Sequence, residues 1–205
     1  YIPVAAGMAG GSTDAAAVLV GVNRMFDLGF TKKELMERGV KLGADVPYCI
    51  MRGTALSEGI GEILTELPAP PQCHLVIAKP QISVSTKAVY GKLRVNELAP
   101  EEHPDIDGMM AAIKNGDLDG VIERLGNVLE TVTVPDHPEI AEIKEIMVEN
   151  GASGSLMSGS GPTVFGIYKD RELAEKACQA LREADGGRLT RQVYLTEFYN
   201  RKKAR

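Results

Sequence analysis

A glycine-rich stretch near the start of the chain has the residue types of an anion-binding loop. Gly7, Gly10 and Gly11 are followed by Ser12 and Thr13, and an apolar run with helical spacing comes next. The first N–H groups of a helix have no partner inside the helix, and the helix dipole adds partial positive charge there. Glycine lets phosphate oxygens approach the backbone because it has no side chain. The stretch therefore predicts a phosphate-binding loop at a helix N-terminus.

An ordinary capped turn is the simpler interpretation of a Gly-Gly-Ser sequence, because many glycine turns before helices bind nothing. Ser12, Thr13 and Asp14 all favour a helix N-terminus. Two common phosphate-binding patterns do not fit, since no Lys follows the last glycine and the spacing is not G-x-G-x-x-G. The residue types alone leave the turn and the phosphate loop as alternatives.

Asp45 is the first candidate for acid–base chemistry. It lies in the sequence Gly-Ala-Asp-Val-Pro at residues 43–47. An aspartate beside Gly and Pro is most often a turn or helix-cap residue. The apolar neighbours nevertheless predict partial burial, an environment typical of functional carboxylates. We therefore consider Asp45 both as a cap and as a general base.

A second glycine-rich stretch, residues 158–165, reads Ser-Gly-Ser-Gly-Pro-Thr-Val-Phe. It is either a flexible hairpin turn or a loop whose backbone N–H groups close a phosphate pocket. It is not a nucleophile elbow, because Gly-x-Ser-x-Gly does not occur there. The candidate binding residues in it are Gly159, Ser160 and Gly161.

Thr86 and Tyr90 follow a buried-strand pattern and a predicted helix cap at Ser85. Tyr90 is most simply an amphipathic-helix residue with its ring in the core. The alternative is an aromatic ring that stacks on a ligand.

Hydrophobic spacing and capping signals predict the elements that position these residues. Ala15, Val18, Leu19, Val22, Met25 and Phe26 fall on one face of a helix, which we expect to be buried. Thr31 and Glu34 form a capping box for a helix to about Lys41, and Pro47 either ends a helix or lies in the first turn of a new one. Further expected elements are a hairpin over 53–67, a linker over 68–71, a strand over 74–78, helices after Ser85 and over 106–113, 118–129 and 140–147, strands near 153–157 and 163–168, a helix over 173–181 and a strand over 192–198. This order predicts an α+β fold with helices packed on an antiparallel sheet.

Composition limits the possible partners of the chain. Its 205 residues carry a net charge of −5, which argues against nonspecific nucleic-acid binding. We expect no membrane span, because no apolar run is long enough. Three widely spaced cysteines predict reduced thiols in a cytoplasmic protein, and the scattered histidines fit no metal pattern.

The glycine loops and the Asp45 segment together resemble the GHMP family of small-molecule kinases. Residues 3–13 match the family's second motif, Pro-x-x-x-Gly-(Leu/Met)-x-(Gly/Ser)-(Gly/Ser)-Ser-(Ser/Thr), and residues 158–165 resemble its third. The branch that phosphorylates a cytidine diphosphate-linked methylerythritol also has Gly-Ala-Asp-Val-Pro and a stretch like Lys79–Tyr90. The similarity spans Pro3 to about Tyr168.

The resemblance implies a fold and a set of site residues. The fold would be a partial ribosomal protein S5 domain 2-like lobe over residues 1–70 and a ferredoxin-like lobe over 71–205. Asp45 would be the catalytic base, Tyr90 would stack on cytosine, and Thr86 with Gly159, Ser160 and Gly161 would bind the substrate. ATP would bind to Pro3, Val4, Ala5, Ala6, Gly7, Met8, Ala9, Gly10, Gly11, Ser12 and Thr13.

The resemblance also implies Mg²⁺ beside ATP, with unknown metal ligands, and a monomer or weak homodimer that acts on a small molecule rather than on nucleic acid or membrane. Because the chain begins at Tyr1 inside a motif, we expect it to be N-terminally truncated. The family's first motif, with its catalytic Lys and its Tyr-His pair, has no counterpart here. Homoserine-type or mevalonate-type kinases and a non-catalytic ligand-binding member stay as alternatives.

Overall fold

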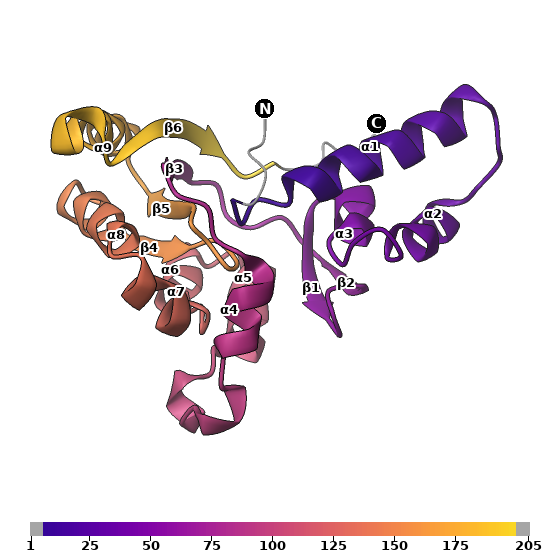
Figure 1. The fold of residues 1–205 in the computed structure, drawn as a ribbon, viewed down its shortest axis with the longest axis horizontal. Helices are drawn as coiled ribbons and strands as arrows, with labels where there is room; N and C mark the ends of the chain where they lie inside the picture. Colours follow the sequence, from indigo (N-terminus) through magenta and orange to yellow (C-terminus); the bar gives the residue numbers. More distant parts are fainter. Residues whose placement is uncertain (1–5, 200–205) are drawn as a thin grey trace. The chain divides into compact units, whose positions relative to one another are not determined.

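The computed structural model describes residues 6–199, apart from the side chain of Arg191. The chain divides into two compact units (Figure 1). The N-terminal unit contains Ala9–Ala69, and the C-terminal unit contains residues 6–8 together with Pro70–Phe198. The lobes that we expected at 1–70 and 71–205 stay a proposal. In the structure, residues 6–8 group with the second unit rather than with the first.

The N-terminal unit consists of helices followed by a hairpin. The predicted capping box is present, since Thr31 N donates to Glu34 Oε2 at 2.8 Å and Thr31 Oγ1 accepts from Glu34 N. Pro47 lies in the first turn of a helix, where its missing N–H costs no hydrogen bond. The elements are α1 (Gly10–Met25), α2 (Lys32–Gly39), α3 (Val46–Met51), β1 (Thr54–Glu58) and β2 (Ile63–Leu67). The two strands pair antiparallel, as predicted.

The buried side of α1 differs from the predicted one. Ala16 is buried against Leu35, Val46 and Ile50 from α2 and α3, and Ala15, Leu19 and Val20 pack around them. The prediction was wrong for four of its six residues, which are exposed within the described structure: Val18, Val22, Met25 and Phe26. The helix is apolar on more than one side, so the positions of α2 and α3 decide which side is covered.

The C-terminal unit is built on a four-stranded antiparallel sheet with the order β4-β5-β3-β6. This is the predicted ferredoxin-like arrangement, in which β3, first in sequence, lies inside the sheet. Its strands are β3 (His74–Pro80), β4 (Gly154–Met157), β5 (Val164–Tyr168) and β6 (Thr190–Glu197). Its α-helices are α4 (Thr86–Lys92), α5 (Ile106–Asn115), α6 (Leu118–Glu123), α7 (Glu130–Asp136), α8 (Glu139–Glu149) and α9 (Arg171–Glu183), and its 3-10 turns are η1 (Val95–Glu97), η2 (Pro100–Glu102) and η3 (Ala184–Gly187).

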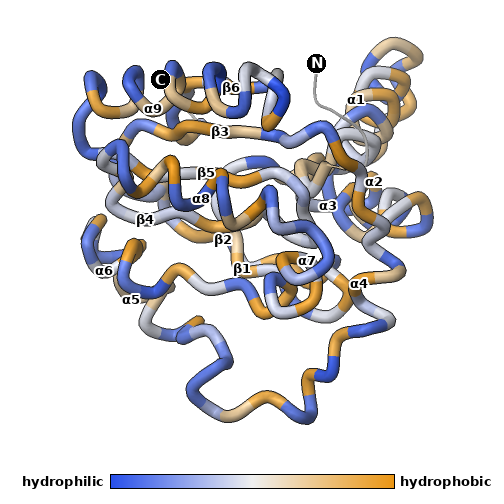
Figure 2. The backbone as a smooth tube through the Cα atoms, turned by 60° about the vertical axis from the view of Figure 1, so that its left-hand side comes forward, coloured by the Kyte–Doolittle hydropathy of each residue, from blue (hydrophilic) through white to orange (hydrophobic). Residues whose placement is uncertain are grey.

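Helices α8 and α9 lie side by side on one face of this sheet (Figure 1). Their fully buried residues, such as Ile143 and Leu181, pack on Val76 and Ala78 of β3. Along α9, hydrophobic and hydrophilic residues alternate with the helical turn, which is the pattern of a helix with one covered side (Figure 2). Neighbouring residues of the strands, including Leu75 and Ile167, point to the opposite face, where Leu118 and Ile122 of α6 pack.

The predicted helix over 118–129 is wrong in its second half. Helix α6 ends at Glu123, and an irregular segment leads to α7, a helix that we did not predict. Within the segment, Asn127 uses its side chain to bind backbone groups of β4 and of the loop after it. The apolar residues of 125–129 fit a helical repeat, but Gly126 and Asn127 are poor helix formers, so these contacts prevail.

Candidate active site

The N-cap of α1 lies three residues before Ser12, the first of the cap signals in the sequence. Ala9, in the left-handed region with φ 49°, precedes Gly10, the first helical residue. No side chain caps the helix, and its first turn contains no acidic residue. The hydroxyl of Thr13 donates to Ala9 O at 2.9 Å instead of capping. The capped-turn interpretation is therefore not supported, and the N–H groups of the first turn have no side-chain acceptor from the described residues.

Asp45 belongs to the same unit and lies at the start of α3. The segment that carries it adjoins the first turn of α1, because a Cβ on Gly43 would lie 3.7 Å from Ser12 Oγ. Cys49, one turn further along α3, has its sulfur 3.6 Å from Thr13 Oγ1. A carboxylate is thus held on a helix that packs beside the expected phosphate-binding turn.

Two expectations for Asp45 need correction. Its side chain is exposed rather than partly buried, because its apolar neighbours Val46 and Pro47 point into the core while Asp45 precedes the helix. It occupies the cap position but makes no side-chain cap hydrogen bond. Within residues 6–199 the Asp45 carboxylate has no hydrogen-bond or ion-pair partner. This leaves both carboxylate oxygens available to an incoming group.

In the C-terminal unit, the start of the first glycine loop contacts the second. Ser158 Oγ donates to Gly7 O at 2.7 Å, and Thr163 N donates to Ala6 O at 3.4 Å. Gly7 has φ +72°, and a Cβ at this position would overlap the carbonyl oxygen of Ser158. Only glycine fits here without a backbone shift. The two glycine-rich stretches therefore pack against each other at Ala6 and Gly7.

The second glycine loop also contacts α4. The hydroxyls of Thr86 and Ser160 lie 2.8 Å apart, although 74 residues separate them in the sequence. Ser85 caps the helix as predicted, by accepting from Ala88 N. Tyr90, one turn after Thr86, is 60% exposed, so the core interpretation of its ring is wrong. Val89 is the buried residue of α4. Thr86, Ser160 and an exposed aromatic ring therefore share one region of this unit.

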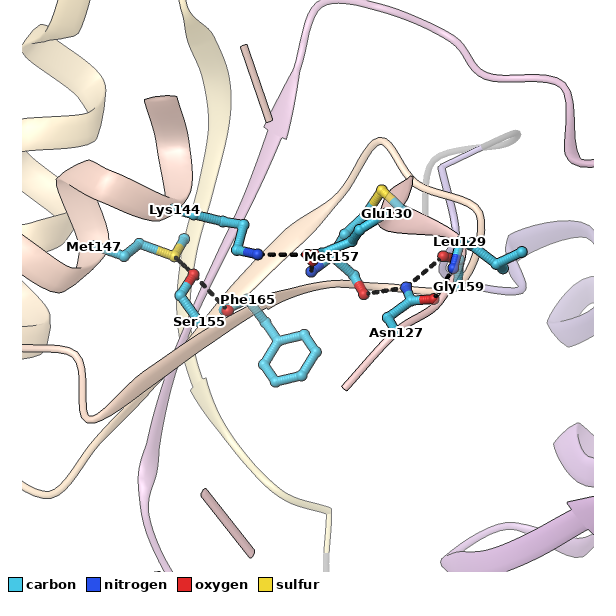
Figure 3. Close-up of polar contacts among 9 residues, drawn as sticks. All are labelled: Asn127, Leu129, Glu130, Lys144, Met147, Ser155, Met157, Gly159 and Phe165. Atoms are coloured by element: carbon cyan, nitrogen blue, oxygen red, sulfur yellow. Dashed lines mark hydrogen bonds and ion pairs between the residues drawn. The ribbon is translucent and has the colours of Figure 1, made fainter. Parts of the chain in front are cut away.

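Sequence reasoning missed Asn127, which binds Gly159 O in the second glycine loop, and Glu130, which binds Met157 N at the end of β4 (Figure 3). The predicted helix over 118–129 includes Asn127 and assigns no contact to its side chain. A Gly-Asn pair inside a helical pattern was the only signal that could have pointed to an irregular segment. Pro3, Val4 and Ala5 of the expected ATP site lie outside the described residues.

Two of the three thiols, those of Cys73 and Cys178, are buried and unsuited to nucleophilic chemistry. The three cysteines are free, as predicted. Burial raises the pKa of the Cys73 thiol to about 11, with the nearby Glu197 carboxylate adding to the effect. Burial also raises the pKa of Cys178. Both side chains are protonated and unreactive at neutral pH.

Comparison with known proteins places these features in a family. Residues 1–53 match the model of the GHMP kinases N terminal domain, and residues 109–186 match that of the GHMP kinases C terminal. The chain is 57% identical over 199 residues to the 4-diphosphocytidyl-2-C-methyl-D-erythritol kinase of Lachnospira eligens, covering 97% of this chain and 67% of that protein. The chain belongs to the GHMP kinase family. The enzyme of the same name from Lachnoclostridium phytofermentans is 52% identical and is also covered to 67%.

Solved structures agree with this assignment. A crystal structure of 4-(cytidine 5'-diphospho)-2C-methyl-D-erythritol kinase matches this GHMP kinase with a TM-score of 0.77 and 30% identity, covering 96% of this chain and 67% of that one. A homoserine kinase from Cytophaga hutchinsonii matches with a TM-score of 0.80 but only 21% identity, over 95% of this chain and 67% of that one, which shows the shared fold alone. This GHMP kinase spans about two thirds of the length of these proteins. It is an ATP-dependent small-molecule kinase with the expected α+β fold.

Proposed function

We propose that the chain carries out the ATP-dependent phosphorylation of the 2-hydroxyl of 4-diphosphocytidyl-2-C-methyl-D-erythritol, a step of the non-mevalonate route to isoprenoid precursors. The observation that carries the proposal is 57% identity over 97% of the chain to a protein of that name. Sequence outweighs fold here, because homoserine kinase has the higher TM-score at much lower identity. Homoserine-type and mevalonate-type kinases are therefore the alternatives that an assay must exclude.

Each unit contributes one part of the proposed reaction. In the N-terminal unit, the N–H groups at the start of α1 bind the negative phosphates of ATP, helped by the helix dipole. Asp45 removes the proton of the acceptor hydroxyl. The hydroxyl oxygen then bonds to the γ-phosphorus of ATP while the bond to ADP breaks and ADP leaves. In the C-terminal unit, Tyr90 stacks on the cytosine while Thr86 and residues 159–161 bind the remainder of the acceptor.

Magnesium accompanies ATP in this proposal. Within residues 6–199 no group of three His, Cys, Asp or Glu side chains is arranged to hold a metal. Mg²⁺ commonly takes substrate phosphates and water as its main ligands and needs few from the protein. Ser12 is the candidate ligand, because its hydroxyl has no partner among the described residues, whereas that of Thr13 is bound to Ala9 O. When bound, the metal neutralises phosphate charge.

The decisive assay offers the complete gene product a panel of alcohols with ATP: the cytidine diphosphate-linked methylerythritol, homoserine and mevalonate. We expect kcat/KM for the first to exceed the other two by several orders of magnitude. Preference for homoserine or mevalonate would assign the chain to another branch, and ATP binding without turnover of any alcohol would support a non-catalytic member.

No helix within residues 6–199 is long and apolar enough to cross a membrane. The cytoplasmic location and the monomeric or weakly dimeric state stay predictions.

Replacing Tyr90 with Ala should raise KM for the cytidine-containing acceptor roughly 5- to 150-fold, because base–aromatic stacking contributes about 1–3 kcal/mol per base. KM for ATP should not change, and Tyr90→Phe should be mild because it keeps the ring. Steady-state kinetics with each substrate varied will test this. Tyr194→Ala is a matched control, since Tyr194 is an exposed ring on β6 of the same unit. An unchanged acceptor KM in folded Tyr90→Ala would exclude stacking.

A further inference from the structure

The second glycine loop is held by a side chain that the proposed reaction does not use. Asn127 Nδ2 donates to Met157 O at 2.9 Å and to Gly159 O at 2.8 Å (Figure 3). Its Oδ1 accepts from Leu129 N at 3.0 Å, at the start of α7. One amide group therefore fixes two carbonyl groups of the loop and ties them to the beginning of a helix.

A charged pair, Glu130 and Lys144, holds the end of β4 just before the loop. Glu130 Oε1 accepts from Met157 N at 2.7 Å, and Glu130 Oε2 accepts from Lys144 Nζ of α8 at 2.6 Å (Figure 3). The Glu130 and Lys144 side chains are only 18% and 27% exposed, so solvent screens this pair less than an exposed one. Because Lys144 lies on a helix with the fully buried residues Ile140, Ile143 and Met147, the pair connects the loop to the core.

These contacts orient the loop peptides. Thr133 Oγ1 of α7 donates to Ser160 O at 3.3 Å, so the carbonyls of Met157, Gly159 and Ser160 all receive donors from residues 127–133. The N–H groups of Gly159 and Ser160 have no acceptor among residues 6–199. Gly159 is exposed and has φ +56°, the conformation found in anion-binding backbone nests. The N–H group of the exposed Gly159 is therefore available to a ligand, whereas Ser160 is buried.

We propose that Asn127 is a positioning residue for the phosphoacceptor, with the Glu130–Lys144 pair as its support. It acts by holding the carbonyls of the loop so that the N–H group of the exposed Gly159 meets an anionic group of the acceptor. The acceptor, rather than ATP, is the ligand because Ser160 is hydrogen-bonded to Thr86, on the helix that carries Tyr90. The identity of this ligand rests on the proposed function, whereas the hold on the loop rests on the contacts alone.

Asn127→Asp separates this role from a structural one. Aspartate keeps the oxygen that accepts from Leu129 N, so the start of α7 is preserved, but it replaces the donor with an oxygen facing two carbonyls. We expect KM for the acceptor to rise about tenfold or more, because the variant loses two hydrogen bonds to the loop and places an oxygen against two carbonyls. KM for ATP should stay within about twofold, a split that a general loss of stability does not produce.

Two further variants complete the experiment. Asn150→Asp is the matched control, because the Asn150 amide also donates to a backbone carbonyl, Ile146 O at 2.8 Å, but makes this bond within the end of α8 rather than to the loop. It should lower Tm without changing either KM. Lys144→Met keeps the apolar stem and removes the ammonium, so it should raise the acceptor KM about threefold through Glu130. This variant decides the question if Asn127→Asp does not fold.

Amide hydrogen exchange of Ser158 and Gly161 in the ligand-free protein gives a readout that needs no turnover, because their N–H groups donate to Thr163 O and Ser158 O within the loop. Exchange should become faster in Asn127→Asp and Lys144→Met and stay unchanged in Asn150→Asp. If the wild-type protein phosphorylates no cytidine-containing acceptor, the proposed function fails, and the exchange data still decide whether Asn127 holds the loop. Unchanged acceptor KM and unchanged exchange in folded variants, or equal rises in both KM values, would overturn the proposal.

Discussion

Replacing Asp45 with Asn should lower kcat by about 10²–10⁴-fold, the usual contribution of a general base. The structure makes this replacement a clean test. The Asp45 side chain makes no cap hydrogen bond and has no partner among the described residues, so the amide should not disturb α3. The affinity for ATP should change little, because the base acts on the acceptor hydroxyl. Steady-state assays of the complete gene product will measure kcat, and nucleotide titration will measure the affinity for ATP.

The control for Asp45 is Asp27→Asn, which makes the same change of charge in the same unit. Asp27 is exposed and has φ 46°, a conformation that Asn also tolerates. We expect wild-type kcat from it. If Asp45→Asn turns over as fast as the control, Asp45 has no part in the mechanism and is only an exposed residue at the start of α3.

Gly7→Ala should lower kcat/KM about 10²-fold, a loss that displacement of catalytic groups by about 1 Å can cause. The added Cβ would overlap the Ser158 carbonyl oxygen, and the backbone at Gly7 has φ +72°. The two glycine loops would have to separate, which breaks the hydrogen bond from Ser158 Oγ to Gly7 O. Because Gly7 lies in the expected ATP loop and Ser158 adjoins the expected acceptor loop, KM for both substrates should rise.

Gly21→Ala tests whether the Gly7 effect is specific. A Cβ at Gly21, inside α1, would have no atom within 4 Å, and Ala favours a helix more than Gly does. This variant should keep full activity and be as stable as the wild type or more so. Thermal denaturation will show whether Gly7→Ala is folded at the assay temperature. A folded Gly7→Ala variant with normal kcat/KM would mean that the loops need not pack together for catalysis.

Much of the secondary structure followed from local patterns in the sequence. The capping box at Thr31, the hairpin over 53–67, the strand over 74–78 and the cap at Ser85 all appear as expected. The reason is that each depends on residues within a few positions of one another, whose hydrogen bonds and side-chain periodicity are settled locally. The motif spacing of the two glycine loops likewise pointed to the GHMP kinase family before any contact was known.

Only the tertiary structure decided which sides of these elements are covered. The apolar stripe of α1 gave no sign that Ala16 would be buried while Val18 and Met25 are exposed, because that depends on where α2 and α3 pack. Tyr90 is exposed for the same kind of reason, since Val89 takes the buried position on α4. A hydrophobic pattern shows that a residue can be buried, but burial needs a partner surface from elsewhere in the chain.

The role of Asn127 was the furthest from the sequence. Its amide binds carbonyls 30 and 32 residues away, and those contacts break the helical pattern that its neighbours suggest. Ser158 and Gly7, whose hydrogen bond joins the two glycine loops, are 151 residues apart. The sequence by itself determined most of the elements, the motifs and the family, because these are local properties of the chain. Folding decided which polar groups meet, because an unpaired carbonyl is satisfied by whatever donor the packed elements place beside it.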